Sequence, residues 1–160
     1  MKEIKHFTQF QSYKDINELT EVDRNLVLLA REALKDAYAP YSKFQVGAAI
    51  LLDNGQTIKG SNQENAAYPM CLCAERVALS AVASVAPSSI VKTMAITAKS
   101  PSVTINQPIS PCGACRQVIC ETEMKQREAI RVILQGEEGE IYIFNSSKDL
   151  LPLFFDGTYL

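Results

Sequence analysis

Residues 61–76 read SNQENAAYPMCLCAER, and we interpret the rest of the chain around this stretch. It contains the triplet Cys73-Ala74-Glu75, and a later stretch, residues 111–115, reads PCGAC. Together they supply three cysteine sulfurs and one nearby carboxylate. Zinc favours sulfur ligands, and three protein ligands leave the fourth position of a tetrahedral site to water. The pair of stretches therefore predicts a metal site with an acidic side chain beside it.

The spacing of the cysteines indicates how they meet. Cys112 and Cys115 are three residues apart, so at the start of a helix both sulfurs lie on one face of the first turn. The free backbone N–H groups at a helix start stabilise thiolates. Cys73 stands in the same position at the start of another expected helix. We expect the two helix N-termini to bring three sulfurs together as ligands.

Glu75 follows Cys73 by two residues, which is roughly 200° around an ideal helix. It is poorly placed to bind the same ion, but it could reach a water held there. We therefore expect Glu75 to be the catalytic residue that transfers protons. Three thiolates and Zn²⁺ sum to a negative charge, so a cation should offset it. We expect Arg76, in preference to Arg116, to donate a hydrogen bond to a ligand sulfur.

Cys71 raises an alternative for the same residues. With Cys73, Cys112 and Cys115 it could complete a four-sulfur structural zinc site that is closed to water. Glu75 would then have no role, and we disfavour this alternative. Cys120, further along the expected helix, is interpreted as a core residue.

The hydrophobic patterns on either side alternate between strands and helices. Helices are expected at 21–37, 74–83 and 113–123, and strands at 45–52, 56–60, 91–98, 129–134 and 140–144. Alternating elements of this kind predict an α/β fold, a three-layer α-β-α sandwich with a central mixed sheet of about five strands. We expect residues 1–160 to form a single catalytic domain in which residues 1–19 are an N-terminal arm or edge strand.

The composition limits the classes of function. The chain has 160 residues, a net charge of −2 and scattered Lys and Arg. Nucleic-acid binders usually carry a basic face, so we expect a small uncharged substrate and no nucleic-acid partner. No apolar run is long enough to span a membrane and none resembles a signal peptide. We expect a cytoplasmic protein without a membrane partner, in which five cysteines favour a metal over disulfides.

Several further motifs occur in a fixed order from about residue 39 to 155. They are APYSKF at 39–44, VGAA at 46–49, NQENA at 62–66, YP at 68–69, CAER at 73–76, SPCGACRQ at 110–117, LLP at 150–152, and Phe155. With these motifs the sequence resembles the small, homotetrameric, zinc-dependent cytidine deaminases of the cytidine/deoxycytidylate deaminase superfamily. The resemblance implies the cytidine deaminase-like fold. It also implies hydrolytic deamination of cytidine and 2'-deoxycytidine to uridine and 2'-deoxyuridine plus ammonia, in pyrimidine salvage.

The resemblance also implies roles for individual residues. It implies one Zn²⁺ per subunit on Cys73, Cys112 and Cys115, with Glu75 as the proton shuttle. Substrate-binding positions carried over from the family are Phe44 on the pyrimidine, Asn62 and Glu64 on the ribose hydroxyls, backbone groups near Ala74, and Phe155 reaching a neighbouring subunit's site. The implied assembly is a homotetramer with its sites at subunit interfaces.

Other functions stay open at this point. One is a deaminase of a related modified nucleoside or nucleoside antibiotic, although a ribose-binding pair favours ordinary nucleosides. From a different class, the chain could be a non-catalytic binding module stabilised by structural zinc. A polynucleotide deaminase is disfavoured by the charge and by a tail that would narrow the site.

Overall fold

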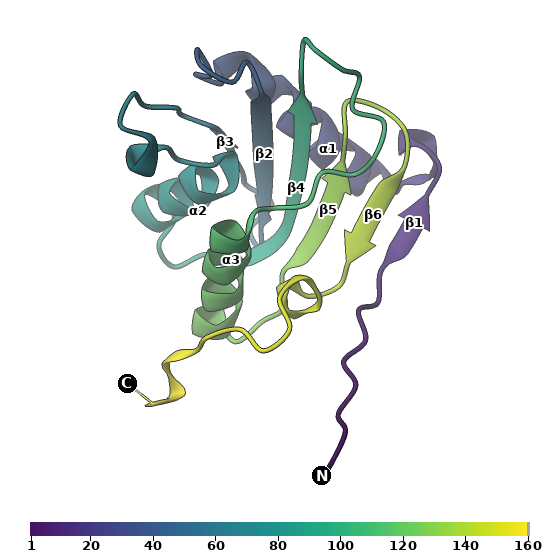
Figure 1. Ribbon diagram of the computed structural model, residues 1–160, viewed down its shortest axis with the longest axis vertical. Coiled ribbons are helices and arrows are strands. Elements are labelled where there is room, and N and C mark those ends of the chain that lie inside the picture. Colours follow the sequence, from purple (N-terminus) through teal and green to yellow (C-terminus); the bar gives the residue numbers. More distant parts are fainter. Residues whose placement is uncertain (160) are drawn as a thin grey trace.

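A computed structural model describes residues 1–159 of the chain (Figure 1). Its centre is a six-stranded sheet in the order β1-β6-β5-β4-β2-β3. The strands are β1 (Gln11–Tyr13), β2 (Gln45–Leu52), β3 (Thr57–Ser61), β4 (Val91–Lys99), β5 (Arg131–Gln135) and β6 (Ile141–Phe144). Strands β4 and β5 run parallel, and the other neighbouring pairs are antiparallel. The sheet is therefore mixed, as the sequence predicts.

Three α-helices cover the two faces of the sheet. Helix α1 (Glu21–Ala33) lies behind the sheet in Figure 1, while α2 (Ala74–Val85) and α3 (Gly113–Gln126) lie in front. The three-layer sandwich expected from the sequence is thereby confirmed. The sheet has six strands where about five were expected, because a segment of the N-terminal arm pairs with β6 as β1.

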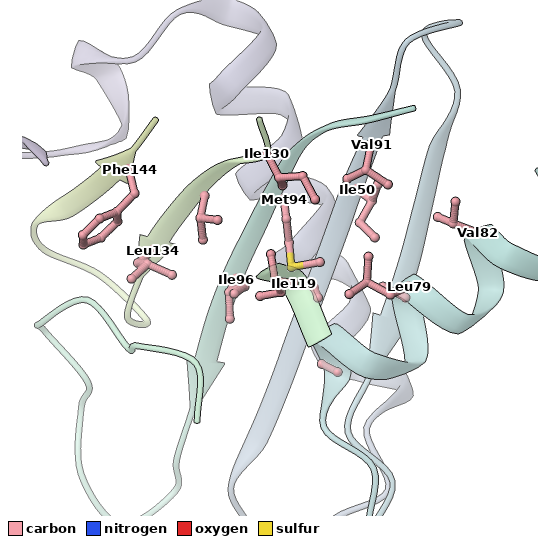
Figure 2. Close-up of a cluster of buried hydrophobic side chains, with 14 of the residues drawn as sticks. Ile50, Leu79, Val82, Val91, Met94, Ile96, Ile119, Ile130, Leu134 and Phe144 are labelled. Carbon is pink, nitrogen blue, oxygen red and sulfur yellow. The ribbon is translucent and has the colours of Figure 1, made fainter. Parts of the chain in front are cut away.

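Each face of the sheet has its own buried core. Figure 2 shows the core of the front face, where Leu79 and Val82 of α2 and Ile119 of α3 point toward side chains of the sheet. The second core lies under α1, whose buried residues include Leu26 and Val27. Burying one such side chain stabilises the fold by about 1.5–3 kcal/mol. The two cores therefore hold α2 and α3 on the sheet that carries the site.

Helix α2 lies unusually close to strand β3 at Gly60. A Cβ atom built on Gly60 would come within 2.5 Å of both the Ala74 carbonyl oxygen and the Ala78 backbone nitrogen. Real Cβ atoms do not approach backbone atoms this closely, so a side chain at this position would displace the helix. The missing Cβ of Gly60 thus sets how near the first turn of α2 comes to the sheet.

The N-terminal arm contacts the front face beside β6. The Phe10 ring packs against Tyr142 and Phe144 with ring centroids 4.6 and 5.2 Å apart. The Thr8 hydroxyl donates a hydrogen bond to the Asp149 carbonyl at 3.1 Å. These contacts support the expected packing role of the arm. Across residues 1–159, no helix combines the length and the hydropathy that crossing a bilayer requires.

Candidate active site

Cys73, Cys112 and Cys115 converge between the N-termini of α2 and α3. Cys73 is the N-cap residue of α2, Cys112 is the N-cap residue of α3, and Cys115 lies in the first turn of α3. Within residues 1–159 these three sulfurs form the group that could hold a metal ion, with all sulfurs inside 4.8 Å of one another. The convergence expected from the sequence is present.

The sulfur separations suit zinc. Two thiolates at about 2.3 Å from a tetrahedral Zn²⁺ lie about 3.8 Å from each other. The Sγ atoms of Cys73 and Cys112 are 3.8 Å apart, and those of Cys112 and Cys115 are 3.5 Å apart. Cys115 is buried and Cys112 is exposed, so the group opens on one side. Three soft ligands on one side of an ion leave its remaining position to another molecule.

Cys71 lies outside this group of three sulfurs. Its Sγ accepts a hydrogen bond from the Asn65 backbone N–H at 3.2 Å, and its thiol donates to the Asn65 carbonyl at 3.6 Å. Its contacts therefore hold the loop after Glu64 against the loop before α2. This geometry does not support a site of four sulfurs.

Arg76 makes the contact that was expected of it. Its Nη2 donates to the Sγ of Cys73 at 3.8 Å and to the Cys71 carbonyl at 3.0 Å. The pKa of the Arg76 guanidinium is raised, first by its hydrogen bond to Cys73 and then by the negative charge of that thiolate. A fixed positive charge therefore lies directly beside one predicted ligand.

Arg116 has a different task. Its Nε donates to the Pro111 carbonyl at 2.8 Å, and its Nη1 donates to the Leu150 carbonyl at 2.7 Å. The neighbouring Gln117 donates through Nε2 to the Phe155 carbonyl at 2.8 Å. Two successive residues of α3 thus bind the C-terminal tail.

The cysteines and Glu75 influence one another's protonation. A hydrogen bond from the Cys115 thiol, followed by the contact with Arg76, lowers the pKa of Cys73 to about 5. The pKa of Cys115 moves the other way, because it donates that hydrogen bond and is buried. Glu75 is only 4% exposed, and this burial is the largest cause that raises its pKa. The negative charge of the Cys73 thiolate raises the pKa of Glu75 further. A raised pKa makes the Glu75 carboxylate a stronger proton acceptor than an exposed glutamate, which suits a group that carries protons.

A pocket of about 500 Å³ opens beside the sulfurs. Its wall includes Glu75, Cys73 and Cys112 together with the predicted substrate-binding residues Phe44, Asn62 and Glu64. This volume is within the range of small-molecule sites. The pocket joins the predicted metal ligands to the predicted nucleoside contacts.

Asn62 and Glu64 are both tied to the loop that carries Phe44. The Asn62 side chain accepts from the Val46 N–H at 2.8 Å and donates to the Phe44 carbonyl at 2.9 Å. An amide side chain has two N–H donors and two acceptor lone pairs, so one of each remains for a ligand. Asn62 therefore both shapes the loop and keeps capacity for a sugar hydroxyl.

The Glu64 carboxylate can accept few further hydrogen bonds beyond those it makes within the protein. Its Oε2 accepts from the backbone N–H groups of Tyr41 at 2.9 Å and Ser42 at 3.2 Å, and its Oε1 accepts from the Ser42 hydroxyl. The Ser42 hydroxyl is the largest cause that lowers the pKa of Glu64, which therefore stays ionised. A carboxylate offers about four acceptor positions, so one position remains, on Oε1.

Two other predicted contacts lie apart from the pocket wall. Ala74 is fully buried at the start of α2, so its side chain has a packing role and its backbone is what a ligand could use. Phe155 is 68% exposed and is not among the residues that line the pocket of its own chain. Its contribution to a neighbouring subunit's site stays a prediction.

Sequence reasoning missed part of the pocket wall. Val46, Ile96 and Ile109 line it although they were assigned to strands or loops without a role at the site. Ile109 directly precedes the quoted motif at residues 110–117, which was an available signal. Ile96 belongs to a central strand, and its presence in the pocket depends on which face of the sheet α2 and α3 cover.

The zinc-dependent deaminases bind their metal through cysteine or histidine side chains and use a glutamate that is not a ligand to move protons. The three sulfurs at two helix N-termini and the buried Glu75 beside them place this chain in that class. Residues 20–129 match the cytidine and deoxycytidylate deaminase zinc-binding region. The chain therefore belongs to the cytidine and deoxycytidylate deaminase family, whose cofactor is zinc.

Individual relatives agree with this assignment. The chain is 39% identical over 132 residues to a cytidine deaminase of Halalkalibacterium halodurans, covering 82% of this chain and 92% of the relative. It is 36% identical over 104 residues to a cytidine deaminase of Mycobacterium tuberculosis, covering 64% of this chain and 74% of the relative. The crystal structure of cytidine deaminase from Burkholderia pseudomallei superposes with a TM-score of 0.71 at 36% identity, covering 86% of this chain and all of that one.

Proposed function

We propose that this protein is a cytidine deaminase that hydrolyses free cytidine and 2'-deoxycytidine to uridine and 2'-deoxyuridine plus ammonia, in pyrimidine salvage. The observation that carries the proposal is the common pocket of about 500 Å³. Two of the three clustered sulfurs, those of Cys73 and Cys112, line this pocket together with the buried Glu75 and with Phe44, Asn62 and Glu64. The agreement with relatives that are named cytidine deaminase supports the same activity.

The proposed metal ligands are Cys73, Cys112 and Cys115, whose separations fit one zinc ion per chain. Zinc held there supplies activation of a water molecule for attack on C4 of the cytosine ring. The Glu75 carboxylate accepts one proton from the attacking water and delivers it to ring nitrogen N3. It then accepts the second proton of the same oxygen and delivers it to the amine, which leaves as ammonia while C4 becomes a carbonyl. Arg76 keeps a positive charge beside the Cys73 sulfur throughout.

The remaining residues of the pocket wall bind the nucleoside. The Phe44 ring packs on the pyrimidine, and the remaining N–H of Asn62 and the remaining acceptor position of Glu64 bind ribose hydroxyls. Supporting this assignment, both polar side chains keep capacity for a ligand after their bonds within the protein are counted. The backbone at Ala74, the first residue of α2, offers free N–H groups to the base carbonyl.

We also propose that the working enzyme is a homotetramer in which Phe155 completes the site of a neighbouring subunit. Its exposure and its position outside its own pocket support this. Light scattering after gel filtration measures the subunit number. Phe155→Ala should raise the KM for cytidine, and a monomeric protein with full activity would contradict the proposal. The cytoplasmic location stays a prediction.

The decisive experiment for the activity is an ultraviolet assay of cytidine loss. The purified protein should convert cytidine and 2'-deoxycytidine but not polynucleotides, lose activity with a chelator, and regain it with added zinc. Cytosine and a modified cytosine nucleoside belong in the same panel. Absence of cytidine turnover by zinc-loaded protein would refute the proposal and favour a zinc-stabilised binding module.

A further inference from the structure

The hydroxyl of Ser42 connects the loop that carries Phe44 to Glu64, the carboxylate proposed to bind the sugar. The Ser42 hydroxyl donates a hydrogen bond to Glu64 Oε1, and its oxygen accepts one from the Phe44 backbone N–H at 3.0 Å. Lys43 between them has a left-handed backbone with φ of 60°, which reverses the chain. Ser42 also lines the pocket. One side chain therefore contacts both the sugar-binding carboxylate and the peptide of the ring that faces the base.

The direction of these hydrogen bonds is fixed by the groups involved. An ionised carboxylate only accepts, so the Ser42 hydroxyl hydrogen must point at Glu64. A backbone N–H only donates, so Phe44 must use the hydroxyl oxygen. The two N–H groups of Tyr41 and Ser42 already occupy Oε2 of Glu64. The atom left for a ribose hydroxyl is therefore Oε1, the same oxygen that Ser42 holds in place.

We infer that Ser42 is a positioning residue that sets the selectivity of the site for nucleosides with a hydroxylated sugar. It aims Oε1 of Glu64 at the ribose hydroxyl and links that oxygen to the Phe44 peptide. This inference rests on the proposed deaminase function. It assigns to Ser42 an effect on substrate binding and not on proton transfer, because the hydrogen bonds of Ser42 join it to Glu64 and Phe44 and not to Glu75 or the clustered sulfurs.

A purely structural role for Ser42 makes a different prediction. Serine hydroxyls often bond a backbone N–H two residues on and so stabilise a turn. If Ser42 only stabilised the turn, Ser42→Ala would weaken the binding of every substrate by the same factor. If Ser42 acts through Glu64, the loss depends on the sugar hydroxyls, because a substrate without them makes no bond to Oε1.

The test compares cytidine with 2',3'-dideoxycytidine, which lacks both hydroxyls, on the zinc-loaded protein. Ser42→Ala should raise the KM for cytidine roughly tenfold to a hundredfold, the range for losing a hydrogen bond to a charged group, with kcat little changed. The KM for 2',3'-dideoxycytidine should change by less than about twofold. Ser42→Thr, which keeps the hydroxyl, should restore the cytidine KM. Ser84→Ala, at an exposed serine on α2, is the matched control and should behave as wild type.

A double-mutant cycle shows whether the effect passes through Glu64. In a Glu64→Ala background, adding Ser42→Ala should change the cytidine KM by less than about twofold, because the acceptor of the Ser42 hydroxyl has already been removed. Equal losses on the two substrates, or a full additional loss in the Glu64→Ala background, would overturn the inference while leaving the deaminase function intact. A wild-type protein that does not deaminate cytidine would overturn both. Thermal unfolding of each variant confirms that Ser42, an exposed loop residue, was replaced without loss of fold.

Discussion

Glu123 offers the sharpest stability prediction, because it is a buried carboxylate at the end of the helix that carries Cys112 and Cys115. It is 4% exposed and accepts four hydrogen bonds. These come from the Ile130 N–H at 3.0 Å, the Ser147 N–H and hydroxyl at 2.8 Å each, and the Ser146 hydroxyl at 2.6 Å. Glu123 thereby joins α3 to the start of β5 and to the turn after β6.

The size of the effect follows from those four bonds. Removing one partner of a buried charged network costs about 3–5 kcal/mol, so Glu123→Ala should lower the free energy of unfolding by about that amount. Glu123→Gln keeps one oxygen acceptor and loses the charge. Its loss should be smaller, about 1.5–3 kcal/mol, the value of a hydrogen bond to a charged group. Glu121→Gln, at an exposed position on the same helix, is the matched control and should change stability by less than about 0.5 kcal/mol.

The effect of Glu123 should depend on pH with a definite sign. Burial alone would raise its pKa, but the hydrogen bonds outweigh burial and hold the pKa below its ordinary value of 4.5. A lowered pKa in the folded state contributes stability that is present above the unfolded pKa. That stability is lost as the pH falls through the folded value. The difference between wild type and Glu123→Gln should therefore be full at neutral pH and shrink below about pH 4.5.

Urea unfolding at fixed zinc concentration measures this difference. The midpoint should fall in Glu123→Gln and the slope should not change, since the same surface is exposed. Zinc release at low pH affects wild type, variant and the Glu121→Gln control alike, so it cancels in the comparison. A Glu123→Gln protein as stable as the Glu121→Gln control, or a loss that is the same at pH 4 and pH 7, would refute the reasoning.

Three further variants test the site and its support. Gly60→Ala should push α2 away from β3, lower the free energy of unfolding by about 1–3 kcal/mol in urea, and lower turnover in the cytidine assay. An unchanged free energy of unfolding would mean that the close approach at Ala74 is not needed. Arg76→Gln should keep the fold and lower kcat/KM roughly tenfold to a hundredfold, the usual effect of removing a side chain that supports a metal ligand, and full activity would remove its role. Cys71→Ser should leave one zinc per chain by metal analysis, whereas loss of zinc would revive the four-sulfur alternative.

Much of the fold could be predicted from local sequence patterns. The run at 45–52 is strand β2 within its expected bounds, and Gly113 begins α3 as expected. The end of α3 was missed because Arg127 closes the helix in a left-handed conformation, φ 57°, that glycine usually supplies. Strand β1 has three residues and no clear hydrophobic alternation. It forms by pairing with β6, which is more than 120 residues away in the chain, so its local sequence does not predict it.

Some parts of the candidate site could likewise be predicted from the sequence and others could not. The cysteines and Glu75 could be found because metal chemistry restricts residue types and because helix starts fix their direction. The bonds of Ser42 and Asn62 could not, since they depend on how residues 62–64 pair with the loop at 38–46. Phe44 could be placed on the pocket wall from its family motif, but the hydrogen bonds that hold its peptide became visible only in three dimensions.

The central claim is that a zinc site built from three cysteines works with Glu75 as the proton carrier. The most direct measurement is zinc content and cytidine turnover of Glu75→Gln, which keeps the shape of the side chain. The account predicts about one zinc per chain, an unchanged fold, and turnover lowered by a factor of roughly 10² to 10⁴ or more. A Glu75→Gln protein that binds zinc and deaminates cytidine at the wild-type rate would contradict it.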